Sequence, residues 1–155
     1  MAYSNFSQAP EFFSPPGAVG SARSSLVPER RICMKVFIVE DFLQTRQELV
    51  GLLTAVDGFE VVGQAGTVQE ALSNIEAAAP EAMVLDISLP DGSGVEVLKY
   101  VRRRGWALRV VVLTGNLYEA LRVKCEQLGA TAVLHKINGL AQAREALLAG
   151  ERSQG

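Results

Sequence analysis

Histidine and cysteine are scarce in this 155-residue sequence, which has one histidine, His135, and two cysteines, Cys33 and Cys125. The two cysteines have no metal-binding or redox spacing, and two unclustered thiols fit a reducing compartment better than a disulfide scaffold. His135 has no partner ligand nearby and is not expected to bind a metal. The sequence therefore argues against a metal site built from histidine and cysteine.

An excess of basic charge and long apolar runs are also absent. The net charge of −2 provides no basic field to hold nucleic acid or an anionic membrane. Apolar runs such as Val110–Leu113 are far too short to span a bilayer, and the N-terminus lacks the features of a signal peptide. We therefore expect a cytoplasmic protein with no membrane segment and no direct binding to nucleic acid.

Proline becomes rare after residue 33, because four of the six prolines lie before that point among many serines. This composition cannot bury enough surface to offset the entropy of ordering, so residues 1–33 are interpreted as a disordered extension. The predicted domain covers residues 34–150, and residues 151–155 form a short tail. We expect no repeat and no second domain.

Strands and helices alternate in the predicted domain. Four short and nearly unbroken apolar runs are typical of parallel strands covered on both faces: Val36–Val39, Ala82–Leu85, Val110–Leu113 and Thr131–Leu134. A fifth strand, Phe59–Ala65, contains polar residues, as an edge strand does. Five strand–helix units predict an α/β fold with a doubly wound five-stranded parallel sheet, flavodoxin-like with order 2-1-3-4-5, and five helices.

Helix starts and ends are indicated between these strands. Three pairs have the spacing of a capping box: Thr67 with Glu70, Ser93 with Glu96, and Asn116 with Glu119. Three glycines stand where helices are expected to end: Gly105, Gly129 and Gly150.

Polar residues follow four of the predicted strands, at the edge where open α/β sheets bind ligands. Glu40 and Asp41 follow the first strand, Asp86 the third, Thr114 the fourth and Lys136 the fifth. With the predicted strand order, the three carboxylates converge, and they repel one another unless a cation joins them. An all-oxygen ligand set favours Mg²⁺. The hydroxyl and the ammonium suit a phosphoryl group, which the carboxylate of Asp86 can accept as an acyl phosphate.

Each of these residues taken alone has a simpler interpretation. Acidic residues after a strand also suit the start of a helix, Asp86 and Thr114 also suit turns and caps, and a lysine is most often a solvated charge. The functional interpretation is favoured because all of them fall at the same end of core strands.

From Met34 to Gly150 the chain resembles a response-regulator receiver domain of two-component signal transduction. Residues 34–41 (MKVFIVED) are similar to the family's opening strand and acidic pair. Residues 84–94 (VLDISLPDGSG) match the phosphoacceptor loop closely, and this motif is the most specific one. Residues 112–115 (VLTG) resemble the fourth-strand motif with its switch hydroxyl, and Lys136 completes the set.

The resemblance implies a phosphorylation-controlled switch that is not an enzyme beyond its own phosphorylation and dephosphorylation. A histidine kinase or phosphotransfer protein would phosphorylate Asp86 in a Mg²⁺-dependent reaction, with the carbonyl oxygen of Ser88 as an additional metal ligand. The output would be a changed surface around the fourth helix and fifth strand, bound by a downstream protein target. The resemblance leaves homodimer formation open.

Two positions depart from the common pattern. Val133 stands where the family often has Tyr or Phe, so we expect phosphorylation to shift the switch only partly. Ile137 follows Lys136 where many members have a cis proline, and we expect a trans bond because a cis bond before a non-proline residue costs about 3 kcal/mol. The strand at Phe59–Ala65 and the missing proline are similar to receivers that precede a LuxR-type DNA-binding domain. The sequence ends before such a domain could follow, which fits either a stand-alone receiver or a truncated chain.

Two other functions stay open. One is a small Mg²⁺-dependent phosphohydrolase of the haloacid-dehalogenase type, although such enzymes generally place a second Asp two residues after the nucleophile, where this chain has Ser88. The other is a degenerate receiver that acts only as a binding module. Turnover of a phosphomonoester indicates the enzyme, whereas one stable phosphate per chain indicates the switch.

Overall fold

A computed structural model describes residues 33–152, so the predicted extension over residues 1–33 lies outside the described residues apart from Cys33. The elements follow one another in this order: β1 (Met34–Val39), α2 (Leu43–Thr54), β2 (Phe59–Ala65), α3 (Val68–Ala78), β3 (Ala82–Asp86), β4 (Ser88–Leu89), β5 (Gly92–Ser93), α4 (Val95–Arg104), β6 (Arg109–Thr114), α5 (Glu119–Gln127), β7 (Ala132–His135) and α6 (Lys136–Arg152).

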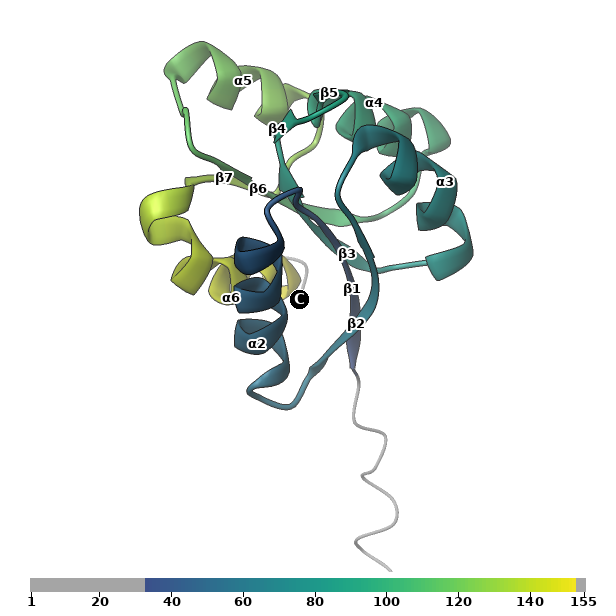
Figure 1. The fold of residues 1–155 in the computed structure, drawn as a ribbon, viewed down its shortest axis with the longest axis vertical. Helices are drawn as coiled ribbons and strands as arrows, with labels where there is room; N and C mark the ends of the chain where they lie inside the picture. Colours follow the sequence, from purple (N-terminus) through teal and green to yellow (C-terminus); the bar gives the residue numbers. More distant parts are fainter. Residues whose placement is uncertain (1–32, 153–155) are drawn as a thin grey trace, which may run out of the picture. The chain divides into compact units, whose positions relative to one another are not determined.

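Five parallel strands form one sheet in the order β2-β1-β3-β6-β7, and β4 and β5 form a separate two-stranded hairpin. The order confirms the predicted doubly wound α/β fold, with Phe59–Ala65 as an edge strand. Figure 1 shows α3, α4 and α5 on one face of the sheet and α2 and α6 on the other. Within residues 33–152, no helix is long and apolar enough to cross a membrane.

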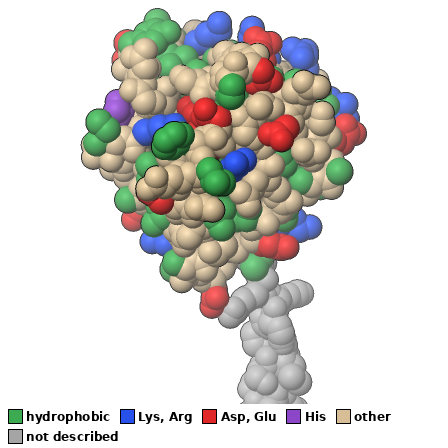
Figure 2. Space-filling model, viewed as in Figure 1, with side chains coloured by type: hydrophobic (Ala, Val, Ile, Leu, Met, Phe, Trp, Pro, Cys, Tyr) green, Lys and Arg blue, Asp and Glu red, His purple; other side chains and the backbone are tan. Residues whose placement is uncertain are grey.

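The central strands are buried on both faces, which explains their nearly continuous apolar sequences. Side chains alternate along each strand, so Phe37 and Val39 pack beneath α3, α4 and α5, while Val36 and Ile38 pack against α2 and α6. In the view of Figure 2, acidic and basic side chains are interspersed over the surface, in keeping with the net charge of −2.

Glycine ends two helices as predicted but does not end the third. Gly105 lies directly after α4 with a φ of 70°, and Gly129 lies two residues after α5 with a φ of 96°. Both angles are in the left-handed region, which glycine adopts without strain. The predicted end at Gly150 is wrong, because α6 continues through Arg152. A glycine costs a helix about 1 kcal/mol relative to alanine, which is too little to end it here.

Two of the three predicted capping boxes are also wrong. The hydroxyl of Ser93 accepts a hydrogen bond from the backbone N–H of Val95 at 3.1 Å, while Gly94 occupies the N-cap of α4. Helix α5 begins at Glu119 with Tyr118 at its N-cap. The N–H of Asn116, which a capping box would pair with the Glu119 side chain, instead donates to the Thr114 hydroxyl at 3.2 Å.

Two different segments supply hydrogen-bond acceptors for the first backbone N–H groups of α3. As predicted, the hydroxyl of Thr67 accepts a hydrogen bond from the Glu70 N–H at 3.0 Å. The carboxylate of Asp91, in the turn between β4 and β5, accepts bonds from the N–H groups of Val68 at 2.8 Å and Gln69 at 3.0 Å. The first three N–H groups of α3, which have no partner within the helix, therefore all have acceptors.

The charge of Asp91 predicts a pH-dependent stability. The bonds from Val68 and Gln69 hold the pKa of the Asp91 carboxyl below its ordinary value of 3.8. A carboxyl whose pKa is lower in the folded protein than in the unfolded chain stabilises the fold at pH values above the unfolded-state pKa. This stabilisation is lost as the pH falls through the folded-state pKa. Asp91→Asn should therefore be less stable than the wild type at neutral pH, and the difference should close in acid.

Urea unfolding of both proteins at a series of pH values measures this difference. Glu96→Gln, which removes an exposed carboxylate from the first turn of α4, serves as the matched control. A difference between wild type and Asp91→Asn that stays the same at every pH would show that the charge of Asp91 does not stabilise α3.

Candidate functional site

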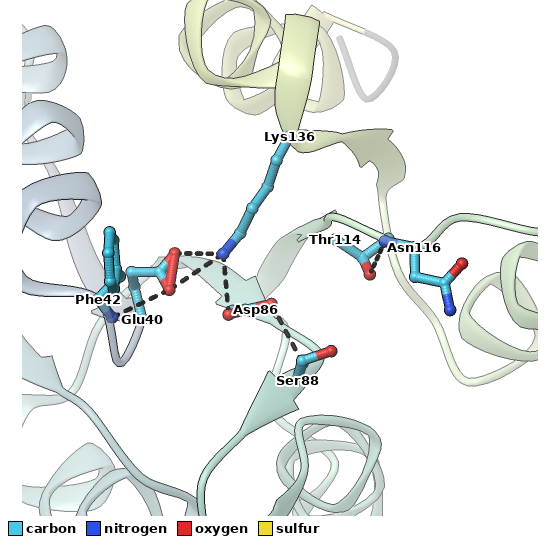
Figure 3. A network of polar contacts seen from close by, with 7 residues as sticks. All are labelled: Glu40, Phe42, Asp86, Ser88, Thr114, Asn116 and Lys136. Carbon is cyan, nitrogen blue, oxygen red and sulfur yellow. Dashed lines mark hydrogen bonds and ion pairs between the residues drawn. The ribbon is translucent and has the colours of Figure 1, made fainter.

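The predicted site residues meet at the carboxyl-terminal edge of the sheet. Glu40 and Asp41 directly follow β1, as predicted. Asp86 and Thr114 are the last residues of β3 and β6 rather than the residues after them, and Lys136 is the first residue of α6. Figure 3 shows Lys136 extending from the start of α6 toward Glu40 and Asp86.

The ammonium group of Lys136 bridges two buried carboxylates. Its Nζ lies 2.6 Å from Oε1 of Glu40 and 3.0 Å from Oδ2 of Asp86 (Figure 3). Glu40 is 1% exposed and Asp86 is 3% exposed, so both acids have lost nearly all contact with water. A buried carboxylate is costly unless it is paired and hydrogen-bonded. Lys136 therefore makes it possible for two acids to be buried side by side.

This single ammonium does not fully compensate the acids around it. Burial raises the pKa of Glu40 from 4.5 to about 7, against the opposing effect of the Lys136 hydrogen bond, and the nearby Asp86 raises it further. Burial alone would lower the pKa of Lys136, but hydrogen bonds to Glu40 and Asp86 outweigh it and leave that pKa above 10.5. The site therefore carries an excess of negative charge around a charged lysine.

A third carboxylate lies beside this pair. Glu40, Asp41 and Asp86 each offer one oxygen, and the three oxygens lie within 4.8 Å of one another. Asp41 is exposed, so the group opens to water on one side. Three carboxylates with access to water suit a hard divalent cation that keeps part of its hydration shell. The donor chemistry and the raised pKa of Glu40 therefore both fit a cation.

Backbone groups orient two of the acids. The N–H of Ser88 donates to Oδ1 of Asp86 at 3.1 Å, and the N–H of Phe42 donates to Oε2 of Glu40 at 3.3 Å (Figure 3). Asp86 consequently has one oxygen bound by the Ser88 amide and the other bound by Lys136. The Phe42 contact was not predicted, because a backbone donor leaves no signal in the identity of its side chain.

Thr114 lies at the same sheet edge but makes a different contact. Its side chain is buried, and its oxygen accepts the hydrogen bond from the Asn116 N–H. Because that bond uses a lone pair of the hydroxyl, the hydroxyl proton is still available for donation. A hollow of about 390 Å³ adjoins this hydroxyl, and Ser88, Lys99 and Lys124 are among the residues that line it.

The two positions that depart from the common receiver pattern lie in opposite environments. Val133 is 3% exposed and packs in the core beneath α5. Ile137 is 81% exposed, and the bond that precedes it is trans as predicted, since residues 33–152 contain no cis peptide. The ring of His135 accepts a hydrogen bond from the Ile137 N–H through Nδ1 at 3.1 Å.

Comparison with known proteins supports the predicted family. The model of the response regulator receiver domain matches residues 36–148. The DNA-binding transcriptional activator DevR/DosR of Mycobacterium tuberculosis is 38% identical over 112 residues, which cover 72% of this chain and 52% of that protein. The chain spans about half the length of the curated relatives that it matches.

Solved structures agree with this result. The signal receiver domain of the response regulator NarL from Mycobacterium tuberculosis is 26% identical with a TM-score of 0.72, and the match covers 78% of this chain and 98% of that one. A LuxR-family response regulator from Aurantimonas is 28% identical with a TM-score of 0.69, over 76% of this chain and 86% of that one. The chain belongs to the receiver domains of two-component response regulators, which are phosphorylation-controlled switches.

Proposed function

We propose that Asp86 accepts a phosphoryl group from a histidine kinase or phosphotransfer protein in a Mg²⁺-dependent reaction, and that this changes a surface bound by a downstream partner. The observation that carries the proposal is the position of the Asp86 carboxylate. It lies between the Ser88 amide and the Lys136 ammonium, within reach of two further acids. The carboxylate proposed as nucleophile, the Lys136 ammonium and the two further acids are therefore close to one another.

The side chains of Glu40, Asp41 and Asp86 and the carbonyl oxygen of Ser88 would hold the metal. When bound, Mg²⁺ supplies positive charge that offsets the negative charge of phosphoryl oxygens. The raised pKa of Glu40, which burial causes first and the nearby Asp86 increases, fits this assignment, because a cation beside a buried carboxylate favours its charged form. The exposed side of the group, at Asp41, leaves room for water ligands.

The carboxylate of Asp86 would act as the nucleophile. One carboxylate oxygen forms the new O–P bond while the N–P bond of a phosphohistidine breaks, and the leaving imidazole takes the electron pair of that bond. Lys136, now 3.0 Å from Asp86, is placed to donate to a phosphoryl oxygen.

Thr114 would connect phosphorylation to the surface. Its hydroxyl proton can bond a phosphoryl oxygen, and hydrogen bonds to charged groups contribute about 1.5–3 kcal/mol each. Two such bonds, from Thr114 and Lys136, approach but do not reach the roughly 5.5 kcal/mol that a shift from 1:99 to 99:1 requires. The small buried side chain of Val133, in place of an aromatic ring, supports a partial shift around α5 and β7.

Exposed apolar side chains support docking of a phosphodonor protein over the site. Phe42 is 61% exposed, Leu43 is 58% exposed and Ile137 is 81% exposed. The backbone N–H of Phe42 donates to Glu40, and Ile137 directly follows Lys136, which pairs with the same acid. Exposed apolar residues around a polar centre are typical of a protein-binding surface.

Mg²⁺ titration of the full-length chain, followed by amide chemical shifts near Glu40 and Asp86, should give a saturating response of modest affinity. Asp41→Asn should weaken binding by about tenfold or more, since loss of an outer-shell partner already costs that much. Glu60→Gln, which removes an exposed acid on β2, should leave the affinity unchanged. Wild-type binding in the double variant Asp41→Asn, Asp86→Asn would place the metal elsewhere.

Incubation with acetyl phosphate and Mg²⁺ should add one phosphoryl group per chain, detected by intact-mass spectrometry. Asp86→Asn should add none, because an amide cannot form the acyl phosphate. Asp57→Asn, which alters another exposed aspartate, serves as the control. Repeated turnover of a small phosphomonoester without an accumulated phosphoprotein would support a phosphohydrolase and contradict the switch.

Ile137→Ser should slow phosphorylation by a phosphorylated histidine phosphotransfer protein and leave phosphorylation by acetyl phosphate unchanged. We expect about a tenfold loss in kcat/KM, because central interface residues contribute more than about 1 kcal/mol each. Val56→Ser is the matched control, since Val56 is an exposed apolar residue beyond the far end of α2. An equal slowing with both phosphodonors would mean that Ile137 affects the chemistry and not the docking.

A further inference from the structure

The hairpin formed by β4 and β5 carries Ser88 and lies directly after Asp86. Ser88 pairs with Ser93, and Leu89 pairs with Gly92, in an antiparallel arrangement only two pairs long. A two-stranded hairpin of this length is not stable by itself and needs support from its surroundings. The source of that support matters because the hairpin adjoins the phosphoacceptor.

One end of the hairpin is held against Asp86. The Ser88 N–H donates to Oδ1 of Asp86 at 3.1 Å, and the Gly94 N–H donates to the carbonyl oxygen of Ile87 at 2.7 Å. A Cβ atom on Gly94 would collide with the backbone carbonyl oxygen of Asp86, so the two backbones are in close contact. A displacement of the hairpin would therefore be transmitted to the Asp86 backbone and carboxylate.

The other end of the hairpin is held against α3. Both carboxylate oxygens of Asp91 accept hydrogen bonds from this helix, one from the Val68 N–H and one from the Gln69 N–H. A negative charge at a helix N-terminus is also stabilised by the helix dipole. Apolar packing adds to this, because Leu89 is buried in the cluster of core residues against which Val68 of α3 packs.

These contacts distinguish Asp91 from an ordinary helix cap. Thr67 caps α3 from within its own segment through a bond to the next turn. Asp91 instead connects α3 to a loop 22 to 23 residues away in sequence, and that loop ends against Asp86. Removing Thr67 weakens only the start of α3, whereas removing Asp91 also frees the turn of the hairpin.

We propose that Asp91 is a positioning residue for the phosphoacceptor site, holding the β4–β5 hairpin on α3 so that the Ser88 backbone stays aligned with the Asp86 carboxylate. This inference rests on the proposed function of Asp86. Asp91 does not touch Asp86 in any described contact and acts through Ser88 and Gly94.

Amide hydrogen exchange in the metal-free, full-length chain tests whether Asp91 holds the β4–β5 hairpin in place. Asp91→Ala should speed exchange at Ser88 and Gly94 by about tenfold or more, since local opening governs exchange. Thr67→Ala, which also removes an acceptor from the start of α3, should speed exchange at Glu70 and leave Ser88 and Gly94 at wild-type rates. Equal protection of Ser88 and Gly94 in the two variants would overturn the proposal.

Mg²⁺ affinity and the rate of phosphorylation by acetyl phosphate test whether the position of the hairpin affects the phosphoacceptor site. Asp91→Ala should lower both by about tenfold, as loss of an outer-shell partner does at metal sites. Asp91→Asn, which keeps one acceptor oxygen, should recover part of the loss, and Thr67→Ala should match the wild type. If Thr67→Ala and Asp91→Ala are impaired equally, Asp91 is only a helix cap. If the wild type neither binds Mg²⁺ nor gains phosphate on Asp86, the proposed function fails first.

Discussion

The ion pair between Lys136 and the buried acids Glu40 and Asp86 is the interaction on which the rest of the site depends. A carboxylate that is 3% exposed or less would be costly without a cation within hydrogen-bonding distance. Lys136 provides that cation from the opposite end of the domain sequence, 96 residues after Glu40. The pair therefore joins the first strand to the last helix, and the fold has to be complete before the site exists.

Strand order makes this junction possible. Because β1 and β3 are neighbours in the sheet, the residues at their carboxyl ends meet, and β6 places Thr114 one strand further along. The apolar runs of the strands, buried on both faces, specify that order through packing and not through the acids themselves. The free energy gained by packing the apolar core thus offsets the electrostatic repulsion between the three carboxylates.

The parts of the fold and of the site that follow from local pattern were predictable from the sequence. Nearly continuous apolar runs predicted four of the five sheet strands to within about two residues, a usual uncertainty for element ends, and the fifth, Phe59–Ala65, was predicted as an edge strand despite its polar residues. The polar residues at the ends of these strands are the predicted site residues, and the fold brings them to one edge of the sheet. Sequence patterns failed to predict the local structure where a hydrogen bond to a residue outside the pattern is formed. The Asn116 N–H that a capping box would use donates to the Thr114 hydroxyl instead, and the connection from Asp91 to α3 depends on two segments that meet only in the folded chain.

The charges of the site also bear on the role proposed for the buried Val133. Under the proposed function, phosphorylation of Asp86 would add negative charge to three carboxylates that surround one ammonium, so the phosphoryl group would need further donors around it. Thr114 would be such a donor, and its movement would leave space in a core that is closely packed. An aromatic side chain at Val133 would fill that space and favour the rearranged state, whereas valine is too small to do so. In this proposal, the free energy gained by donors to a phosphoryl group on Asp86 would be opposed by the packing lost near β7, and the balance between these two terms would set how far the domain switches.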